Sequence, residues 1–375
     1  MAGKAEASGK LSIRRLWNAG AVWRWIDERL GLQALAYPVP AHANSVLYTL
    51  GGITFFGILV LIGTGIYLTQ FYHADPPEAR QSVEYIISTA RLGDFLRNLH
   101  FWMANLVTIT LLLHALRVFA TGAYRAPREL NWVAGVGLLG VTLGLVFTGT
   151  VLKWDQEAWE ALQHNEEIGE LLGGAGTWFT SDFTTSTPIL ERLFIAHVAI
   201  LPVLLIGLAA VHLLLVKYHG VSSLPGHEER RPPRRTDTAE AVRTEAYVPF
   251  TNHLLHILGW GLLVTALASV LAVAVSAPLG EVIDPGDEKT KPPWMFLPLY
   301  PFEDWFGIRA LLWLPVTAFI GLLAVPFVDR YGSNSTRRRW ILIAAAVVVI
   351  AALVALAIYA QASTPAEHVA EAEGG

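Results

Sequence analysis

The sequence lacks cysteine: none occurs among its 375 residues. This absence excludes disulfide bonds, thiol catalysis, iron–sulfur ligation by this chain and prosthetic groups attached through thioether bonds. Any metal chemistry must therefore depend on histidine and carboxylate side chains.

Charged residues are also scarce. They make up 15% of the chain, whereas hydrophobic residues make up 53% and the mean hydropathy is +0.44; soluble domains carry about a quarter charged residues. Windows of about 20 residues identify seven apolar runs long enough to cross a bilayer. The runs cover residues 45–69, 99–120, 132–152, 193–216, 254–277, 311–328 and 340–360. They predict an all-α fold, a polytopic membrane protein with seven transmembrane helices. We expect no cleaved signal peptide, because about forty residues with an amphipathic pattern precede the first run.

The distribution of charge predicts the orientation. Together with Arg117 at the end of the second run, the N-terminal segment and the connections after the second, fourth and sixth runs hold 19 of the 27 Lys and Arg residues. The same segments hold only 10 of the 31 Asp and Glu residues. By the positive-inside rule, these segments face the cytoplasm. We therefore predict a multi-pass protein of the inner (cytoplasmic) membrane, with the N-terminus in the cytoplasm and the C-terminus outside.

A polar stretch divides the runs into two groups. Residues 218–247 contain prolines and charges but almost no large apolar side chains, which is typical of a flexible linker. This cytoplasmic linker separates a four-helix domain at 45–217 from a three-helix domain at 248–362. An acidic tail follows at 363–375.

Three other segments outside the runs have recognisable patterns. Within the N-terminal segment, 1–44, residues 11–35 mix Trp, Leu and Arg at helical spacing. This indicates an amphipathic helix on the cytoplasmic face; a short soluble helix is the alternative. Two outer connections are long, 153–192 and 278–310, and the first has the pattern of short surface helices. Loops of this length in compact proteins are usually functional.

Four histidines lie inside the apolar runs. The second run holds His100 and His114, fourteen residues apart, and the fourth holds His197 and His212, fifteen apart. At about 100° per residue these separations return to within about 40° and about 60° of the same helix face, after a rise of about 21 to 22 Å. Because the predicted topology sends both helices from outside to inside, His100 pairs with His197 near the outer face, and His114 pairs with His212 nearer the cytoplasm.

Two imidazoles at each of two depths are what two bis-histidine haems need, and such a stack of haems about 20 Å apart can carry electrons across a bilayer. Ionisable residues inside membranes are usually functional. Two alternatives remain open. Each histidine can be a hydrogen-bonded polar residue of the helix bundle, or a zinc ligand, although only two ligands would meet at each depth.

Glycines follow the same spacing on neighbouring runs. Gly51 and Gly65 are fourteen residues apart, as are Gly135 and Gly149. Missing side chains at these positions fit a flat macrocycle pressed against the backbone. Ordinary small-residue contacts between helices are the alternative.

Two arginines flank the histidines. Arg97 and Arg117 each lie three residues from one of them, toward opposite membrane faces. They are candidates to pair with haem propionates, or to snorkel to the interface. The remaining histidines lie in loops or at helix ends, where we expect them to be solvated or interfacial: His42, His73, His164, His219, His227, His253, His256 and His368.

Motifs across most of the chain carry a resemblance to a known family. In the first half they are WIDERLGLQAL, VPAHANSVLYTLGGIT, HALRVFATGAYRAPRELNWVAGVGLL and GTVLKWDQ, and near the end of the sixth run GLLAVPFVDR. The first half resembles the cytochrome b subunit of the quinol-oxidising Rieske/cytochrome b complexes, the chloroplast and cyanobacterial bf type more than the mitochondrial bc type. Residues 248–360 resemble the three-helix partner subunit of the bf complex, here fused to the first half.

The resemblance implies a function. Quinol is oxidised near the outer face, and one electron passes to a Rieske iron–sulfur protein. The other crosses from an outer b-type haem (His100 and His197) to an inner one (His114 and His212), and a quinone is reduced near the cytoplasm, which builds a proton gradient. Both haems are held non-covalently. The implied partners are the Rieske protein, a cytochrome c-type subunit or soluble c-type (or plastocyanin-like) acceptor, the membrane quinone and a second copy of the complex in a homodimer; we expect no nucleic-acid partner.

The sequence departs from the family at three sites: Thr49, the segment from Pro292 to Met295, and Lys153. In the bf family a cysteine just before the LGGIT-like segment attaches an additional haem covalently, whereas here that position is Thr49. We therefore expect no covalent third haem. The family's quinol site carries a Pro-Glu-Trp-Tyr motif whose glutamate accepts a quinol proton. The matching residues are Pro292, Pro293, Trp294 and Met295, so the carboxylate and the phenol are missing.

Another group must then accept the quinol proton at the outer site. Glu303 and Asp304, or Asp155 at the start of the other long outer loop, are the candidates; water is the alternative. Lys153 occupies a position where the family usually has proline. Lys217, just after the fourth run, matches a basic residue that lines the family's inner quinone site, and a positive-inside anchor is the other interpretation.

Two functions of other classes remain as alternatives. The first is a dihaem membrane anchor of a dehydrogenase or hydrogenase with a single quinone site, which predicts no long outer loops for a Rieske protein to dock against. The second is a haem-free transporter whose histidines relay protons, for which a reduced-minus-oxidised spectrum would show no haem.

Overall fold

The computed structural model describes residues 24–26, 29, 37–222, 247–286, 289–329 and 336–363. Most of the predicted amphipathic helix at 11–35, residues 223–246 of the predicted linker and residues 364–375 of the acidic tail lie outside the described residues. Backbone contacts group the chain into two compact units. They are Met1–Thr49 with Gly220–Trp260, and Leu50–His219 with Gly261–Gly375.

In the first unit, two short strands bring distant segments together. β1 (Pro38–Pro40) pairs antiparallel with β2 (Tyr247–Pro249). Tyr37 stacks on Phe250 beside this ladder, with ring centres 4.7 Å apart. Prolines lack the N–H that a longer ladder requires, which keeps these strands short.

His253 in this unit is buried, so it is not solvated, one of the two settings expected from its sequence position. The residue is only 8% exposed, and its Nδ1 lies 3.2 Å from Oδ1 of Asn44. Asn44 ends the 3-10 turn η2 (Ala41–Asn44), so the side-chain amide satisfies a ring nitrogen that burial would otherwise leave unpaired.

Seven helices in the described residues are long and apolar enough to cross a membrane, which confirms the predicted all-α fold with seven spans. They are α2 (Val46–Leu68), α4 (Gly93–Thr121), α5 (Glu129–Val151), the continuous helix formed by α7 (Ile189–Ile195), η6 (Ala196–Ile200) and α8 (Leu201–His219), α10 (Phe250–Ala274), α12 (Ile308–Val328) and α13 (Thr336–Ala362). Several helices begin a turn or more before their apolar run, because the polar residues there still form helical hydrogen bonds and satisfy the backbone near the interface.

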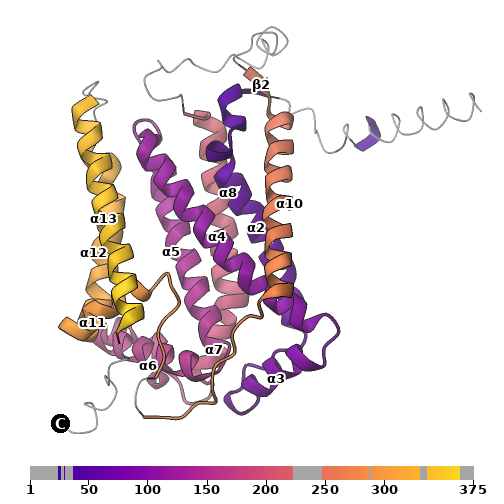
Figure 1. The fold of residues 1–375 in the computed structure, drawn as a ribbon, viewed down its shortest axis with the longest axis vertical. Helices are drawn as coiled ribbons and strands as arrows, with labels where there is room; N and C mark the ends of the chain where they lie inside the picture. Colours follow the sequence, from indigo (N-terminus) through magenta and orange to yellow (C-terminus); the bar gives the residue numbers. More distant parts are fainter. Residues whose placement is uncertain are drawn as a thin grey trace, which may run out of the picture. The chain divides into compact units, whose positions relative to one another are not determined.

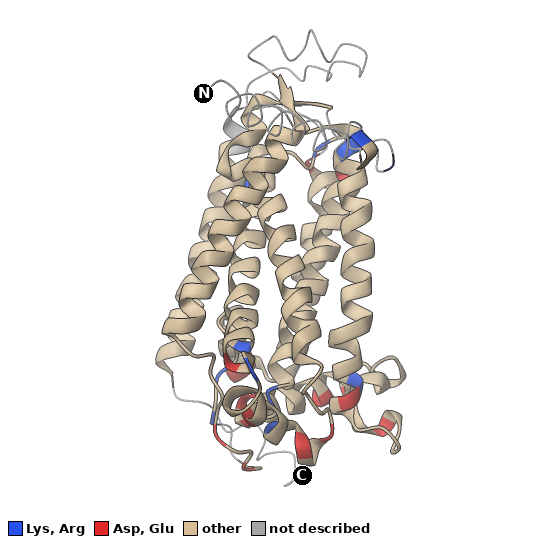
Figure 2. Cartoon of the chain, turned by 90° about the vertical axis from the view of Figure 1, so that its right-hand side faces the viewer, with Lys and Arg blue, Asp and Glu red and all other residues tan. Residues whose placement is uncertain are grey.

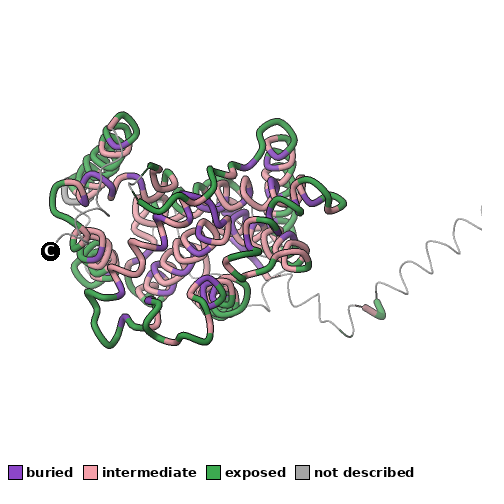
Figure 3. The backbone as a smooth tube through the Cα atoms, turned by 90° about the horizontal axis from the view of Figure 1, so that it is seen from below, coloured by how far each residue is buried: buried purple, intermediate pink, exposed green. Residues whose placement is uncertain are grey.

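In the larger unit, small and aromatic side chains determine which spans pack together. α4 and α10 meet through a buried cluster that includes Met103 and Ala268. A second cluster joins α5 to α12, where Trp132 lies against Leu322 and donates its indole N–H to that residue's carbonyl at 2.7 Å. Buried residues gather where these helices touch, and the outward faces are exposed (Figure 3), as expected for apolar helices that contact lipid.

Short helices cover one end of the larger unit (Figure 1). They are α3 (Pro76–Ser88), α6 (Gln156–Leu171) and α11 (Tyr300–Phe306), with the 3-10 turns η3 (Gly173–Ala175), η4 (Thr177–Phe179), η5 (Ser181–Phe183) and η8 (Leu297–Leu299). This end is called the α6 end below. Acidic side chains are concentrated there (Figure 2), and α6 confirms the surface helix expected in the connection at 153–192.

α3 lies in a connection for which the apolar runs predict no helix. A window of about 20 residues tuned to membrane spans misses it, because α3 has 13 residues and buries only one side, through Ala79, Ser82, Val83 and Ile86. Its signals are the prolines at its first two positions and the apolar residues three and four apart.

Candidate functional site

The structure brings the four membrane histidines together as two pairs. His100 and His197 have ring centres 6.4 Å apart, and His114 and His212 are also 6.4 Å apart. Two imidazoles that bind one metal atom through bonds of about 2 Å have ring centres about 6 Å apart. A direct hydrogen bond between the rings would bring the centres to about 5 Å. The observed separation therefore suits one metal atom held between the rings of each pair.

Two threonine hydroxyls fix the tautomer of the pair nearer the α6 end. Thr64 and Thr148 each donate a hydrogen bond to a carbonyl one turn back on their own helix, at 2.9 and 2.8 Å. Each hydroxyl has a single hydrogen, so toward its histidine it can only accept. His100 Nδ1 lies 2.9 Å from the Thr64 hydroxyl and His197 Nδ1 lies 2.9 Å from the Thr148 hydroxyl. Both protons are therefore on Nδ1, and each Nε2 keeps the lone pair that a metal needs.

The second pair has a different set of partners. His212 Nδ1 lies 3.0 Å from the carbonyl of Asn131, which also can only accept, so His212 is the same tautomer. His114 Nδ1 is buried and has no hydrogen-bond partner among the described residues. Thr64 and Thr148 are absent from the residues that the sequence identifies, although each directly precedes a glycine of the fourteen-residue pattern.

A π-helical turn explains why two different spacings give matching depths. η6 contains His197 and closes with wider turns than an α-helix, which accommodates one additional residue. The fifteen-residue spacing on this helix then acts like the fourteen-residue spacing on α4. Pro202 gives a local cause, because it lacks the N–H that would bond the carbonyl of Val198 and its ring crowds that carbonyl.

Each of the four glycines faces one imidazole. A Cβ added at Gly51 or Gly149 would lie 2.9 or 3.0 Å from Cε1 of the nearest histidine, and one added at Gly65 or Gly135 would lie 3.5 Å away. The pairings are Gly51 with His114, Gly65 with His100, Gly135 with His212, and Gly149 with His197. Within the described residues, the missing side chains thus make room for the histidine rings, and at two positions no larger residue fits without a shift.

The basic residues of the prediction lie in different settings. Arg97 donates hydrogen bonds to the carbonyls of Ala277 and Pro278, at 2.9 and 2.7 Å, and so anchors the connection that follows α10. Arg117 lies one turn beyond His114 on α4, and Lys217 is exposed near the end of α8. A role for Arg97 and Arg117 toward haem propionates stays a prediction.

The segment from Pro292 to Met295 lies at the α6 end, between α10 and α11. The indole N–H of Trp294 donates to Oδ1 of Asn105 at 2.7 Å. Asn105 is on α4, five residues after His100. This bond holds the segment against the helix that carries one histidine of the nearer pair.

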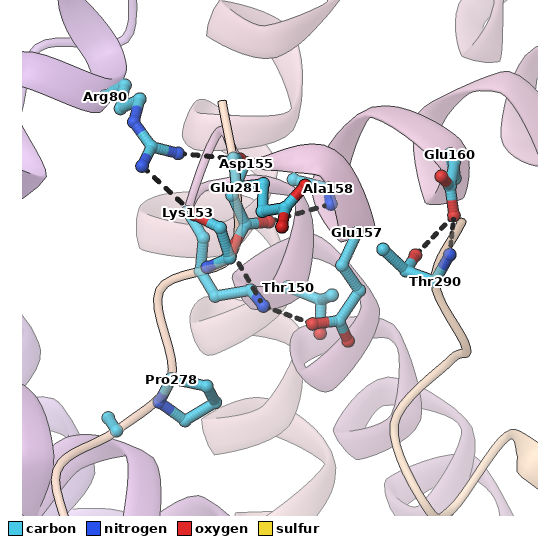
Figure 4. Close-up of polar contacts among 12 residues, drawn as sticks. Arg80, Thr150, Lys153, Asp155, Glu157, Ala158, Glu160, Pro278, Glu281 and Thr290 are labelled. Atoms are coloured by element: carbon cyan, nitrogen blue, oxygen red, sulfur yellow. Dashed lines mark hydrogen bonds and ion pairs between the residues drawn. The ribbon is translucent and has the colours of Figure 1, made fainter. Parts of the chain in front are cut away.

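Asp155 is a buried anchor of the α6 end (Figure 4). Its side chain caps α6 by accepting from the N–H of Ala158 at 3.0 Å, and its other oxygen accepts from the N–H of Gly280 at 2.7 Å. Lys153 pairs with Asp155 and with Glu157, which gives this lysine a structural role at the position where proline is usual. Burial raises the pKa of the Glu157 carboxyl, and the charge of Lys153 acts in the opposite direction.

Glu160, one turn further along α6, fixes the chain just before Pro292. Its carboxylate accepts from the backbone N–H of Lys289 at 2.8 Å and of Thr290 at 2.9 Å. It also accepts from the side-chain amide of Gln156 at 2.8 Å. These contacts connect α6 to the segment that resembles the quinol site.

His164 and Glu303 form a buried pair, which corrects the expectation that His164 is solvated. His164 Nε2 lies 3.0 Å from Glu303 Oε1, and the side chains are 17% and 4% exposed. His164 Nδ1 lies 2.7 Å from the carbonyl of Glu160, which can only accept, so the neutral ring has its hydrogen on Nδ1. The contact between Nε2 and the carboxyl oxygen then requires one shared proton. Asp304, the next residue on α11, is half-buried.

Comparison with known proteins identifies the family. Cytochrome b6 of Heliobacterium mobile is 37% identical over 208 residues, which covers 53% of this chain and 98% of that protein. The profile of the family described as Cytochrome b/b6/petB matches residues 34–220, the part that holds all four paired histidines. The chain belongs to the cytochrome b family. Family membership implies that it binds b-type haem and acts in electron transport in a membrane, and the two bis-imidazole pairs fit that group.

Two further comparisons extend this result. The menaquinol:cytochrome c reductase cytochrome b subunit of Bacillus subtilis is 36% identical over 217 residues, covering 54% of this chain and 97% of that protein. A solved structure titled "Hyperthermophilic respiratory Complex III" has a similar fold, with a TM-score of 0.77 and 22% identity, over 91% of this chain and 92% of that one. Because it covers 91% of this chain, this likeness in fold extends beyond the matched family region, residues 34–220.

Proposed function

We propose that this chain is the dihaem cytochrome b subunit of a quinol:cytochrome c (or plastocyanin-like acceptor) oxidoreductase. It oxidises quinol near the outer face and passes electrons through two b-type haems to an inner quinone site, which contributes to a proton gradient. The observation that carries this proposal is the pair of matched imidazole levels, His100 with His197 and His114 with His212, each with ring centres 6.4 Å apart. When bound, the two haems supply one-electron carriers at two depths.

The α6 end supports a quinol site near the outer histidine pair. Trp294 ties the Pro292–Met295 segment to α4 close to His100, and Glu160 fixes the residues just before it. The name of the Bacillus subtilis relative, a menaquinol:cytochrome c reductase subunit, supports a quinol as the substrate. The inner quinone site is assigned to the opposite end, where Lys217 is exposed at the end of α8.

Glu303 is the group we assign to the quinol proton in place of the missing glutamate. Its buried carboxyl lies 3.0 Å from His164 Nε2, so a proton that the carboxyl accepts can pass on to a neighbouring titratable group, as a proton acceptor at a quinol site requires. Asp155 is less suited, because both of its oxygens already accept hydrogen bonds from the backbone N–H groups of Ala158 and Gly280.

The orientation and partners follow from the same proposal. The connections at the α6 end hold only a minority of the Lys and Arg residues, which supports placing that end outside, next to a Rieske protein and a c-type cytochrome partner. The complex would be a homodimer in the cytoplasmic membrane. At the position where the bf family attaches an additional haem, Thr49 is buried and donates its hydroxyl to the carbonyl of Val46 at 2.9 Å, so the proposal includes no covalent third haem.

Purification of the tagged chain from its own membranes tests this proposal. We expect a reduced-minus-oxidised spectrum of two b-type haems, no covalent haem on a denaturing gel, and a Rieske protein identified by mass spectrometry. Replacing His212 by Leu should remove one of the two haems, whereas replacing the exposed His256 by Leu should leave both. Two haems with a dehydrogenase or hydrogenase as the only co-purified partner would favour the membrane-anchor alternative. No haem at all would overturn the proposal.

A further inference from the structure

The residue before each histidine-facing glycine differs between the two levels. At the level of His100 and His197 it is a threonine, Thr64 or Thr148. At the level of His114 and His212 the fourteen-residue pattern places Leu50 and Ala134 there instead. The two levels therefore share the glycine that receives the ring but not the hydroxyl beside it.

At the outer level, both histidines have a hydroxyl acceptor. At the inner level, only one of the two histidines has an acceptor among the described residues. Thr64 and Thr148 are 6% and 5% exposed, and each lies 2.9 Å from the Nδ1 of its histidine. On the inner level, His212 donates to a backbone carbonyl at 3.0 Å. The buried Nδ1 of His114 has no hydrogen-bond partner among the described residues. The outer level thus has two hydroxyl acceptors, besides the backbone carbonyls of Leu61 and Leu145, whereas the inner level has one acceptor among the described residues.

This difference has an electronic consequence for a bound metal. A metal-binding imidazole that donates its other N–H to an acceptor becomes a more basic ligand. A more basic ligand stabilises the oxidised iron relative to the reduced iron, which lowers the reduction potential. Each hydroxyl that accepts from an outer histidine should therefore lower the potential of a metal bound at that level.

We propose that the hydroxyls of Thr64 and Thr148 are positioning groups for His100 and His197, and that these hydroxyls lower the reduction potential of the outer haem. This inference rests on the proposed function.

Redox titration of the purified complex, followed by haem absorbance, tests the proposal. Replacing Thr64 or Thr148 by Val keeps the branched shape and removes the hydroxyl acceptor, while the backbone carbonyl of Leu61 or Leu145 stays beside the ring. Loss of one neutral hydrogen bond should change the oxidised-to-reduced ratio of the outer haem, at a fixed ambient potential, by up to about tenfold. For a one-electron carrier this equals an increase of about 59 mV in the reduction potential of that haem. Serine at the same positions should restore the original potential. Thr142→Val is the matched control on α5, because the Thr142 hydroxyl donates only to the carbonyl of Leu138, at 2.8 Å, and it should move neither potential.

The reciprocal variant adds the missing hydroxyl at the inner level. Leu50→Thr places a threonine before Gly51, beside the unpaired His114 Nδ1, and should lower the inner potential while the outer one stays constant. If a valine variant loses its haem, this variant decides instead: a lower inner potential supports the proposal and an unchanged one overturns it. Unchanged outer potentials in both valine variants, with two haems retained, would also overturn it. A wild-type complex without two b-type haems would instead refute the proposed function, so the two failures are distinguishable.

Discussion

His164 on α6 and Glu303 on α11 are joined by a contact of 3.0 Å between Nε2 and Oε1, in a region where both side chains are shielded from solvent. Because the other ring nitrogen of His164 is committed to the carbonyl of Glu160, the pair needs a proton between its two members. The contact joins residues that are 139 positions apart and lies at the end of the bundle that carries the Pro292–Met295 segment.

Glu303→Gln should impair quinol oxidation. The amide keeps the shape of the side chain but cannot exchange a proton, and loss of a general base typically costs about 100-fold or more in rate. We expect turnover with quinol to fall by about that factor at the pH optimum of the wild type and the pH profile to flatten on its acidic side. Glu191→Gln, at an exposed carboxylate at the start of α7, is the control and should retain both rate and profile. A Glu303→Gln enzyme with an unchanged profile would assign the quinol proton to another group.

Alanine at the four glycines should have graded effects. A Cβ at Gly51 or Gly149 would lie 2.9 or 3.0 Å from a histidine carbon, whereas at Gly65 or Gly135 it would lie at an ordinary 3.5 Å. We therefore expect Gly51→Ala and Gly149→Ala to lose most of one haem, with Gly65→Ala and Gly135→Ala close to wild type, as measured by haem-to-protein ratio and absorbance. Gly207→Ala on α8, where a Cβ meets nothing within 4 Å, is the control. Equal losses at all four positions would show that a larger group than the imidazole sets the available space.

Asp329→Asn should destabilise the contact between the end of α12 and the connection that follows α4. Asp329 Oδ2, at the end of α12, accepts from the Tyr124 hydroxyl at 2.6 Å and from two nitrogens of Arg125 at 2.9 and 2.8 Å. Removing one charge of a largely buried pair costs about 3 kcal/mol, so the midpoint of thermal unfolding should fall by several degrees. Glu84→Gln, in the surface pair with Arg80, should change it little. Equal midpoints for the two variants would mean that the buried pair contributes no more than a surface one.

Glu157→Gln should change how stability depends on pH. Burial raises the pKa of Glu157 above its ordinary value of 4.5, so the folded protein keeps this proton at pH values where the unfolded chain has lost it. Stability from this group is therefore present below about pH 4.5 and is lost as the pH rises through the folded-state pKa. Gln mimics the protonated form, so the unfolding midpoint of the variant relative to wild type should increase as the pH rises above 4.5. A constant difference from pH 4 to pH 8 would contradict the raised pKa.

The sequence identified the four paired histidines because their spacing is periodic along apolar helices, and a local rule such as about 100° per residue is enough to read it. It did not identify Thr64, Thr148 or His164 as partners of other groups. Each of these contacts joins different helices, as between Thr148 on α5 and His197 in η6, and no local pattern encodes the facing residue. α3 shows a related limit, because its signals are present but are too short for a search tuned to membrane spans.

Composition and periodicity by themselves determined that the chain crosses a membrane seven times. They also determined that each of two helices carries two histidines at different depths on roughly one face. The reason is that lipid requires every backbone group to bond within its own helix, so that length and hydropathy fix the spans. Only the tertiary structure decided which ring nitrogens keep a lone pair and which imidazole has no acceptor within the described part of the chain. It also decided how a π turn at His197 brings a fifteen-residue spacing into line with a fourteen-residue one. Those features depend on contacts of about 3 to 4 Å between side chains of separate helices. Such contacts are determined by how the helices pack, and the separation of the residues along the sequence does not reveal them.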